Sequence, residues 1–266
     1  MLYIVLSIFA VICLYPVFFT LTSSLKNNTE IFTEPFSLPR TPQWENYVRA
    51  WTIGKMGVYF KNSIILTAAT LFVSAIIGSM ASYILAKYTF KGKSFVYILF
   101  LAGMMIPIQT VIIPLAFTFG KMGIVDNLPV LVLLYSAFCL SMTVFIVTGY
   151  MKGLPDELEE AAVMDGAGHG IVFFRIILPL SMPAIASASI FNFVSAWNNL
   201  LFPLVFISKD SMKTISIGLL SFFGAYTSDY GAVMAAIGVS IIPPIIMYIL
   251  LQEKMEKGLT AGAVKG

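Results

Sequence analysis

Hydrophobic and polar positions along this chain are segregated into long blocks. Six stretches lack Asp, Glu, Lys and Arg, and each exceeds the about 20 residues that a helix needs to cross a bilayer core. Lipid gives the backbone no hydrogen-bond partners, so only helices or a closed barrel span it, and no stretch shows the alternation of barrel strands. The first stretch is expected to be a retained helix, since no basic residue precedes it as in a signal peptide. The pattern predicts six membrane-spanning helices, at residues 1–25, 62–86, 94–120, 127–151, 179–208 and 230–252.

The polar connections between these helices differ in length and character. Residues 26–61 form a long loop whose Trp44, Tyr47 and Trp51 suit a membrane interface. Six spans place both termini on the same side of the membrane. Lys and Arg are divided evenly between the two sides, so the positive-inside rule leaves the orientation open. The three lysines of the 87–93 turn favour cytoplasmic termini.

Composition supports the membrane assignment. Hydrophobic residues make up 59% of the 266 positions and charged residues 11%, against about 25% charged residues in soluble domains. These values exclude a soluble globular protein and a disordered chain, which requires low hydrophobicity. The net charge of +3 is small and scattered, which argues against nucleic-acid binding. No metal site is expected, because the chain has a single histidine and its two cysteines lack ligand spacing.

Polar residues inside the expected spans are the candidates for a substrate path. Amides beside an aromatic face suit a sugar, which offers hydroxyl groups and an apolar ring side. Hydrogen bonding between helices is an equally good explanation for these side chains, and both remain open. The candidates are Gln109, Asn192, Trp197, Asn198 and Asn199.

One connection is strongly acidic. Five of the 13 acidic residues lie between Asp156 and Asp165. Pro155 suits the first position of a short helix, the acids suit its positive N-terminal end, and Gly166 is a natural stop. A second short turn over 171–177 then leads into the fifth span. A solvated loop would be enough to explain the acidic charge of this connection.

The spacing within this connection is more specific than its charge. It resembles the EAA loop of permease subunits in ATP-binding cassette importers. Further segments resemble the carbohydrate-uptake branch, in particular the smaller permease subunit of maltose-type importers, and the resemblance covers residues 18–266. The loop residues that carry it are Glu160, Ala161, Ala162, Asp165, Gly166, Ile176, Leu178 and Pro179, and the other segments are 44–47, 62–63, 197–198 and 258–266.

The resemblance implies an all-α membrane protein, a single permease domain over 1–266 with the six-helix fold of type I importers. It places the termini in the cytoplasm and the 26–61 loop outside. The 153–179 loop would carry a cytoplasmic coupling helix that docks on an ATPase subunit. There Ala161 and Ala162 permit close approach, Glu160 pairs with a basic residue of the ATPase, and Gly166 permits the bend.

The resemblance also implies partners and a location. The partners are a second permease subunit, two ATP-binding cassette subunits and an extracytoplasmic sugar-binding protein, in a bacterial cytoplasmic membrane. The chain itself is expected to bind no cofactor and to have no enzymatic activity, because ATP and Mg²⁺ are used by the ATPase subunits. In agreement, Gly92-Lys93-Ser94 lacks the earlier glycine of a phosphate-binding loop. An oligosaccharide is the expected substrate, with monosaccharides and glycerol phosphate derivatives as alternatives.

The competing interpretation is a stand-alone secondary transporter driven by an ion gradient. Proton relays in such proteins use carboxylates within the membrane, and none of the six stretches contains one. A purely structural membrane protein would not explain the EAA pattern.

Overall fold

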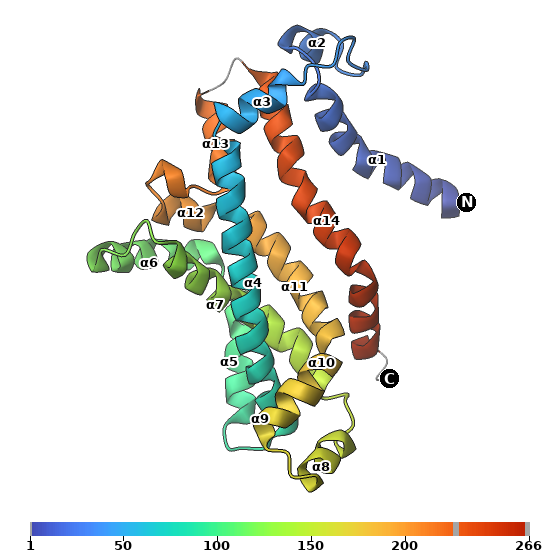
Figure 1. The fold of residues 1–266 in the computed structure, drawn as a ribbon, viewed down its shortest axis with the longest axis vertical. Helices are drawn as coiled ribbons and strands as arrows, with labels where there is room; N and C mark the ends of the chain where they lie inside the picture. The colour runs from blue at the N-terminus through green and yellow to red at the C-terminus, as the bar shows by residue number, and fades with distance from the viewer. Residues whose placement is uncertain (1, 226–228, 264–266) are drawn as a thin grey trace. The chain divides into compact units, whose positions relative to one another are not determined.

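A computed structural model describes residues 2–225 and 229–263, with side chains for 2–222 and 229–253. Within these ranges the chain is helical and contains no strand, which confirms the all-α class (Figure 1). The helices are α1 Leu2–Ser23, α2 Asn28–Thr33, α3 Glu45–Thr52, α4 Met56–Lys87, α5 Lys93–Met105, α6 Ile108–Met122, α7 Leu128–Met151, α8 Glu157–Met164, α9 His169–Val172, the π-helix η1 Phe173–Ile177, α10 Leu178–Leu180, α11 Met182–Trp197, α12 Leu201–Phe206, the 3₁₀ helix η2 Asp210–Met212, α13 Ile215–Ala225 and α14 Tyr230–Ala263.

Four described helices are long and apolar enough to cross a membrane without interruption, namely α1, α4, α7 and the Tyr230–Glu253 part of α14. Two further spans are broken. One is the pair α5 and α6, bent by 95°, and the other joins His169–Leu180 to α11, bent by 70°. Counting each bent pair once gives up to six spans, as the hydrophobic pattern predicts.

The break in the third expected span lies at Pro107. Proline has no amide hydrogen and forces the preceding residue out of the helical region. Ile106 accordingly has ψ 110° and Pro107 has ψ 133°, both extended. Pro114 lies within α6 without ending it. A single kinked helix over 94–120 is therefore replaced by two helices at a sharp angle.

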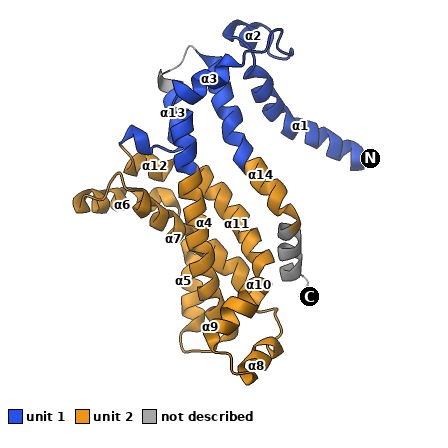
Figure 2. Cartoon of the chain, in the orientation of Figure 1, with its two compact units in different colours: residues 1–63, 209–243 blue, residues 64–208, 244–266 orange. Residues whose placement is uncertain are grey.

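The contacts divide the chain into two compact units (Figure 2). The first comprises Met1–Ser63 and Lys209–Pro243. The second comprises Ile64–Ser208 and Pro244–Gly266. In the second unit, α7 packs against α5 and α11 and supplies a continuous buried face.

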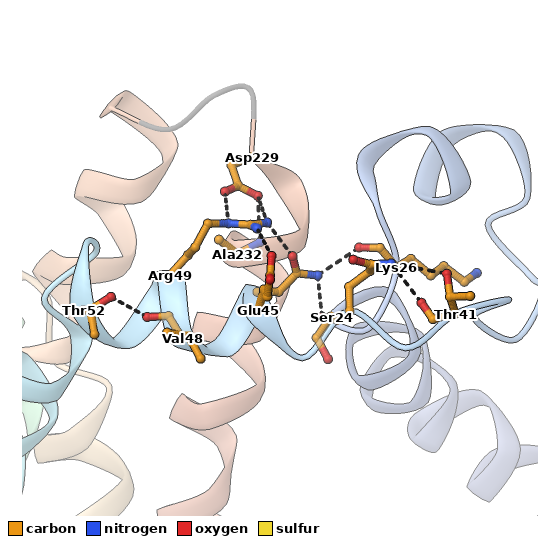
Figure 3. A network of polar contacts seen from close by, with 11 residues as sticks. Ser24, Lys26, Thr41, Glu45, Val48, Arg49, Thr52, Asp229 and Ala232 are labelled. Atoms are coloured by element: carbon orange, nitrogen blue, oxygen red, sulfur yellow. Dashed lines mark hydrogen bonds and ion pairs between the residues drawn. The ribbon is translucent and has the colours of Figure 1, made fainter.

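The first unit contains a polar network around α3, shown in Figure 3. The Arg49 guanidinium donates from Nε and Nη2 to the two carboxylate oxygens of Asp229, at 2.9 and 3.2 Å. Arg49 also donates to Asn46 Oδ1 at 2.6 Å, and the buried Asn46 amide donates to the carbonyls of Ser24 and Lys26. The network therefore connects the residues after α1, helix α3 and the start of α14.

Candidate functional site

The acidic connection folds as a helix–turn–helix in the second unit. Helix α8 ends at Met164, and Gly166 follows with φ +82°, a left-handed conformation that favours glycine. The Gly166 amide donates to the Val163 carbonyl at 2.9 Å and the Ala167 amide to the Ala162 carbonyl at 2.9 Å. These two bonds form the Schellman ending of a helix. Gly166 therefore stops α8 as the sequence predicts.

Helix α8 is attached to the end of α4 by Lys87. The Lys87 ammonium donates to Asp156 Oδ1 and to the Leu154 carbonyl, each at 2.6 Å. It lies 3.8 Å from Glu159 Oε1, and its side chain is only 5% exposed. The hydrogen bond from Lys87 holds the pKa of the Asp156 carboxyl below its ordinary value. One buried cation thus fixes the N-terminal turn of α8.

The neighbouring glutamates Glu159 and Glu160 have different environments. Glu159 is 17% exposed and accepts a hydrogen bond from Tyr83 Oη at 2.9 Å, in addition to its ion pair with Lys87. Glu160 is exposed, and its side chain makes no hydrogen bond or ion pair with another described residue. The sequence pattern pointed to Glu160 and did not indicate the pair Glu159 and Lys87. The lysine-rich turn opposite an acidic segment was the only sequence signal that pointed to such a pair.

Beneath the helix–turn–helix lies an apolar core. Val172 and Ile177 are fully buried and pack with Tyr83 of α4 and Met151 of α7. Three of the predicted coupling residues pack against this core as partly buried side chains, namely Ala162, Ile176 and Leu178. Pro179 is exposed and is the second residue of α10. The Ile-x-Leu-Pro part of the motif therefore seats the connection on the bundle.

The outer side of α8 is exposed. Glu160, Ala161, Asp165 and Gly166 all lie on the surface. Met164 is 86% exposed, which is unusual for a large apolar side chain. A cavity of about 430 Å³ lies between α8 and the segments that it packs on, and its lining residues are Lys87, Tyr88, Glu159, Glu160, Val163, Met164, His169 and Val172. A small helix with an acidic and apolar outer side is suited to docking on another protein.

The structure distributes the five substrate-path candidates over different environments. Asn192 of α11 is 4% exposed and donates to Thr143 Oγ1 of α7 at 2.9 Å, a bond between helices. Trp197 is 3% exposed and stacks on Phe193, with the ring centroids 5.7 Å apart. Gln109 and Asn198 are exposed. The five residues therefore differ in burial and surroundings.

Asn199 is the candidate that borders a cavity. Its Oδ1 accepts from the Phe202 amide at 3.1 Å, at the break between α11 and α12. The cavity has a volume of about 270 Å³ and combines aromatic and polar side chains, among them Tyr135, Phe138, Ser195 and Asn199. Among the described residues no group of three or more His, Cys, Asp or Glu side chains is placed to hold a metal.

Broken apolar helices combined with an exposed helix–turn–helix are consistent with a membrane protein of the transport-permease class. Residues 74–261 match the model of the family described as the binding-protein-dependent transport system inner membrane component. The chain belongs to this family. It is 35% identical to the diacetylchitobiose uptake system permease protein NgcG of Streptomyces coelicolor, over 98% of this chain and 87% of that protein.

Two further comparisons agree with the family. The multiple sugar-binding transport system permease protein MsmG of Streptococcus mutans is 33% identical over 99% of this chain and 96% of its own. The fold is similar to that of a chain in a bacterial ABC transporter involved in the import of the acidic polysaccharide alginate. That likeness has a TM-score of 0.81, covers 94% of both chains and has 24% sequence identity.

These findings confirm the resemblance to importer permeases that rests on the EAA spacing. The protein is a permease component rather than an enzyme. The comparisons give no support to the alternative of an ion-driven secondary transporter.

Proposed function

We propose that this chain forms one half of the translocation path in an ATP-driven oligosaccharide importer and couples to an ATPase subunit through α8. The observation that carries the coupling role is the contrast between the two glutamates. Glu159 is held by Tyr83 and Lys87, which leaves Glu160 on the outer side of a helix that is fixed to the bundle. A charged acceptor held rigidly in this way suits a charge-assisted bond with a basic partner residue.

The proposed complex contains a second permease subunit, two ATP-binding cassette subunits and an extracytoplasmic sugar-binding protein. The ATPase subunits bind ATP and Mg²⁺, and this chain binds no cofactor. Such an arrangement requires that the 153–179 connection and both termini lie in the cytoplasm. The 26–61 loop must then lie on the outer side of the membrane. The bacterial cytoplasmic membrane is the location that this arrangement fits.

The substrate class rests on the relatives, which are named for diacetylchitobiose and for multiple sugars. Within this chain, the 270 Å³ cavity beside Asn199 has the chemistry that a sugar requires. Ser195 and Asn199 offer hydrogen bonds to hydroxyl groups, and Tyr135 and Phe138 offer rings to the apolar face of a pyranose. We place Asn199 on the substrate path, whereas Asn192 serves the contact between α7 and α11.

The coupling role is tested by Glu160→Gln in the assembled complex in proteoliposomes, with ATP hydrolysis and sugar uptake measured together. We expect assembly to weaken and the uptake rate to fall at least tenfold, because a hydrogen bond to a charged group contributes about 1.5–3 kcal/mol. Glu45→Gln is the control, because it removes another exposed glutamate charge, on α3. Equal uptake by wild type and Glu160→Gln would refute the assignment of Glu160.

A further inference from the structure

Four side chains at the base of α8 form one continuous hydrogen-bond chain. Tyr83 Oη lies 2.9 Å from Glu159 Oε2, the Tyr83 and Tyr88 hydroxyls are 3.2 Å apart, and Tyr88 Oη lies 2.8 Å from His169 Nδ1. The rings of Tyr88 and His169 also meet edge to face, with centroids 5.6 Å apart. This series of hydrogen bonds begins on α8, passes through the end of α4 and the residue after it, and ends at the first residue of α9.

The direction of this chain follows from counting its protons. An ionised carboxylate only accepts, so Tyr83 must donate its single hydroxyl proton to Glu159. The contact between the two tyrosines is then a hydrogen bond only if Tyr88 donates to Tyr83. Tyr88 has no second proton for His169. All three contacts are satisfied only when Nδ1 of His169 carries a proton and donates it to Tyr88.

We propose that His169 is held as the Nδ1–H tautomer and that these four residues position both arms of the helix–turn–helix on α4. The charges around the chain favour this direction. Glu159 provides a negative charge at its accepting end, and Lys87 lies 3.8 Å from the other Glu159 oxygen. Of the other titratable groups that line the adjoining cavity, Glu160 is exposed on its rim. The Lys93 ammonium donates to the Tyr88 carbonyl at 2.7 Å and secures that residue.

This arrangement has a mechanical consequence, which rests on the proposed coupling function. A displacement of α8 by a partner pulls on Glu159, and a displacement of α9 pulls on His169. Both forces reach the same short segment, Tyr83 to Tyr88, at the end of α4. The four residues are positioning residues, because they act through α8 and touch neither nucleotide nor sugar. With Nδ1 protonated, a neutral His169 keeps Nε2 as an acceptor.

The tautomer is measurable because the chain has one histidine. The full-length permease, labelled with ¹⁵N-histidine and held in nanodiscs, gives one pair of imidazole nitrogen signals. At a pH where the ring is neutral, we expect the wild-type signals of the Nδ1–H form. Tyr88→Phe keeps the ring contact and removes the hydroxyl, and it should shift the signals towards the Nε2–H form. Wild-type signals of the Nε2–H form would overturn the proposal, whether or not the variant folds.

The positioning role is measured in the assembled complex as sugar taken up per ATP hydrolysed. Tyr83→Phe and Tyr88→Phe should each lower this ratio about fivefold, the factor that the net free energy of one hydrogen bond supplies. Tyr150→Phe is the matched control. Tyr150 packs against the same apolar core, and its hydroxyl contacts no other described residue through a hydrogen bond.

The outcomes separate the two proposals. If the wild-type complex shows no ATP-driven uptake, the proposed function fails, and the tautomer measurement still decides the hydrogen-bond chain. If the wild-type complex transports and the Tyr83 and Tyr88 variants retain its uptake per ATP, the positioning role is refuted and the proposed function stands.

Discussion

Replacement of Gly166 by leucine tests whether the turn after α8 is needed for coupling. Gly166 has φ +82°, and a Cβ placed there would meet no atom within 4 Å. The substitution therefore introduces backbone strain, and the added Cβ meets no neighbour. The turn lies outside the apolar spans, so insertion into the membrane should be unaffected.

The free-energy cost of Gly166→Leu follows from the backbone conformation alone. A residue with a Cβ pays about 1–2 kcal/mol to adopt the left-handed region. That free energy lowers the equilibrium ratio of correctly turned to otherwise folded molecules about 5- to 30-fold. Asparagine tolerates the left-handed region better, so Gly166→Asn should lie between wild type and Gly166→Leu.

The assay is uptake and ATP hydrolysis by the complex in proteoliposomes. We expect Gly166→Leu to assemble in the membrane and to hydrolyse ATP with at least fivefold less uptake per ATP. Gly168→Ala is the control, because Gly168 has φ −72° and open space around it. Wild-type uptake per ATP in Gly166→Leu would refute the reasoning, as would an equal loss in Gly168→Ala.

Three further predictions concern the two compact units. Asn192→Ala should lower the free energy of unfolding in detergent by about 1 kcal/mol, the usual contribution of a hydrogen bond between membrane helices, and an unchanged unfolding midpoint would contradict this. Hydrogen bonds, of which the one from Lys55 has the largest effect, hold the pKa of the Asp210 carboxyl below its usual range. The carboxylate therefore contributes its full stabilisation above the unfolded-state pKa near 4, and this stabilisation is lost as the pH falls below that value. Asp210→Asn should flatten this acid limb in a thermal-unfolding series. Arg49→Ala removes both bonds to Asp229 and should increase amide hydrogen exchange across α3 about tenfold, whereas unchanged exchange would show that the pair does not hold that helix.

The helical spans were accessible from the sequence because they depend on local properties. A charge-free run of about 20 apolar residues has few alternatives in a bilayer. The end of α8 was also predictable, since the left-handed turn at Gly166 depends on one residue and its neighbours. The sequence pattern showed prolines in the third span but could not show that Pro107 would separate two helices at 95°.

The attachment of α8 was not accessible in the same way. Lys87 and Asp156 meet although 69 positions separate them in the chain, and their pairing depends on how α4 and α7 pack. Glu159 and Glu160 are adjacent in sequence, and only the fold decides which of them meets Tyr83. The surroundings of the substrate-path candidates were not accessible for a similar reason, because only the fold shows that Trp197 is buried whereas Asn199 lines a cavity.

The central claim is that energy reaches this permease from ATP through α8. The most direct measurement is oligosaccharide uptake by proteoliposomes that contain this chain, its partner permease, the ATPase subunits and the binding protein. We predict uptake that requires internal ATP and all the partners, and none by this chain alone. Uptake by this chain alone, driven by a proton gradient without ATP, would contradict the account.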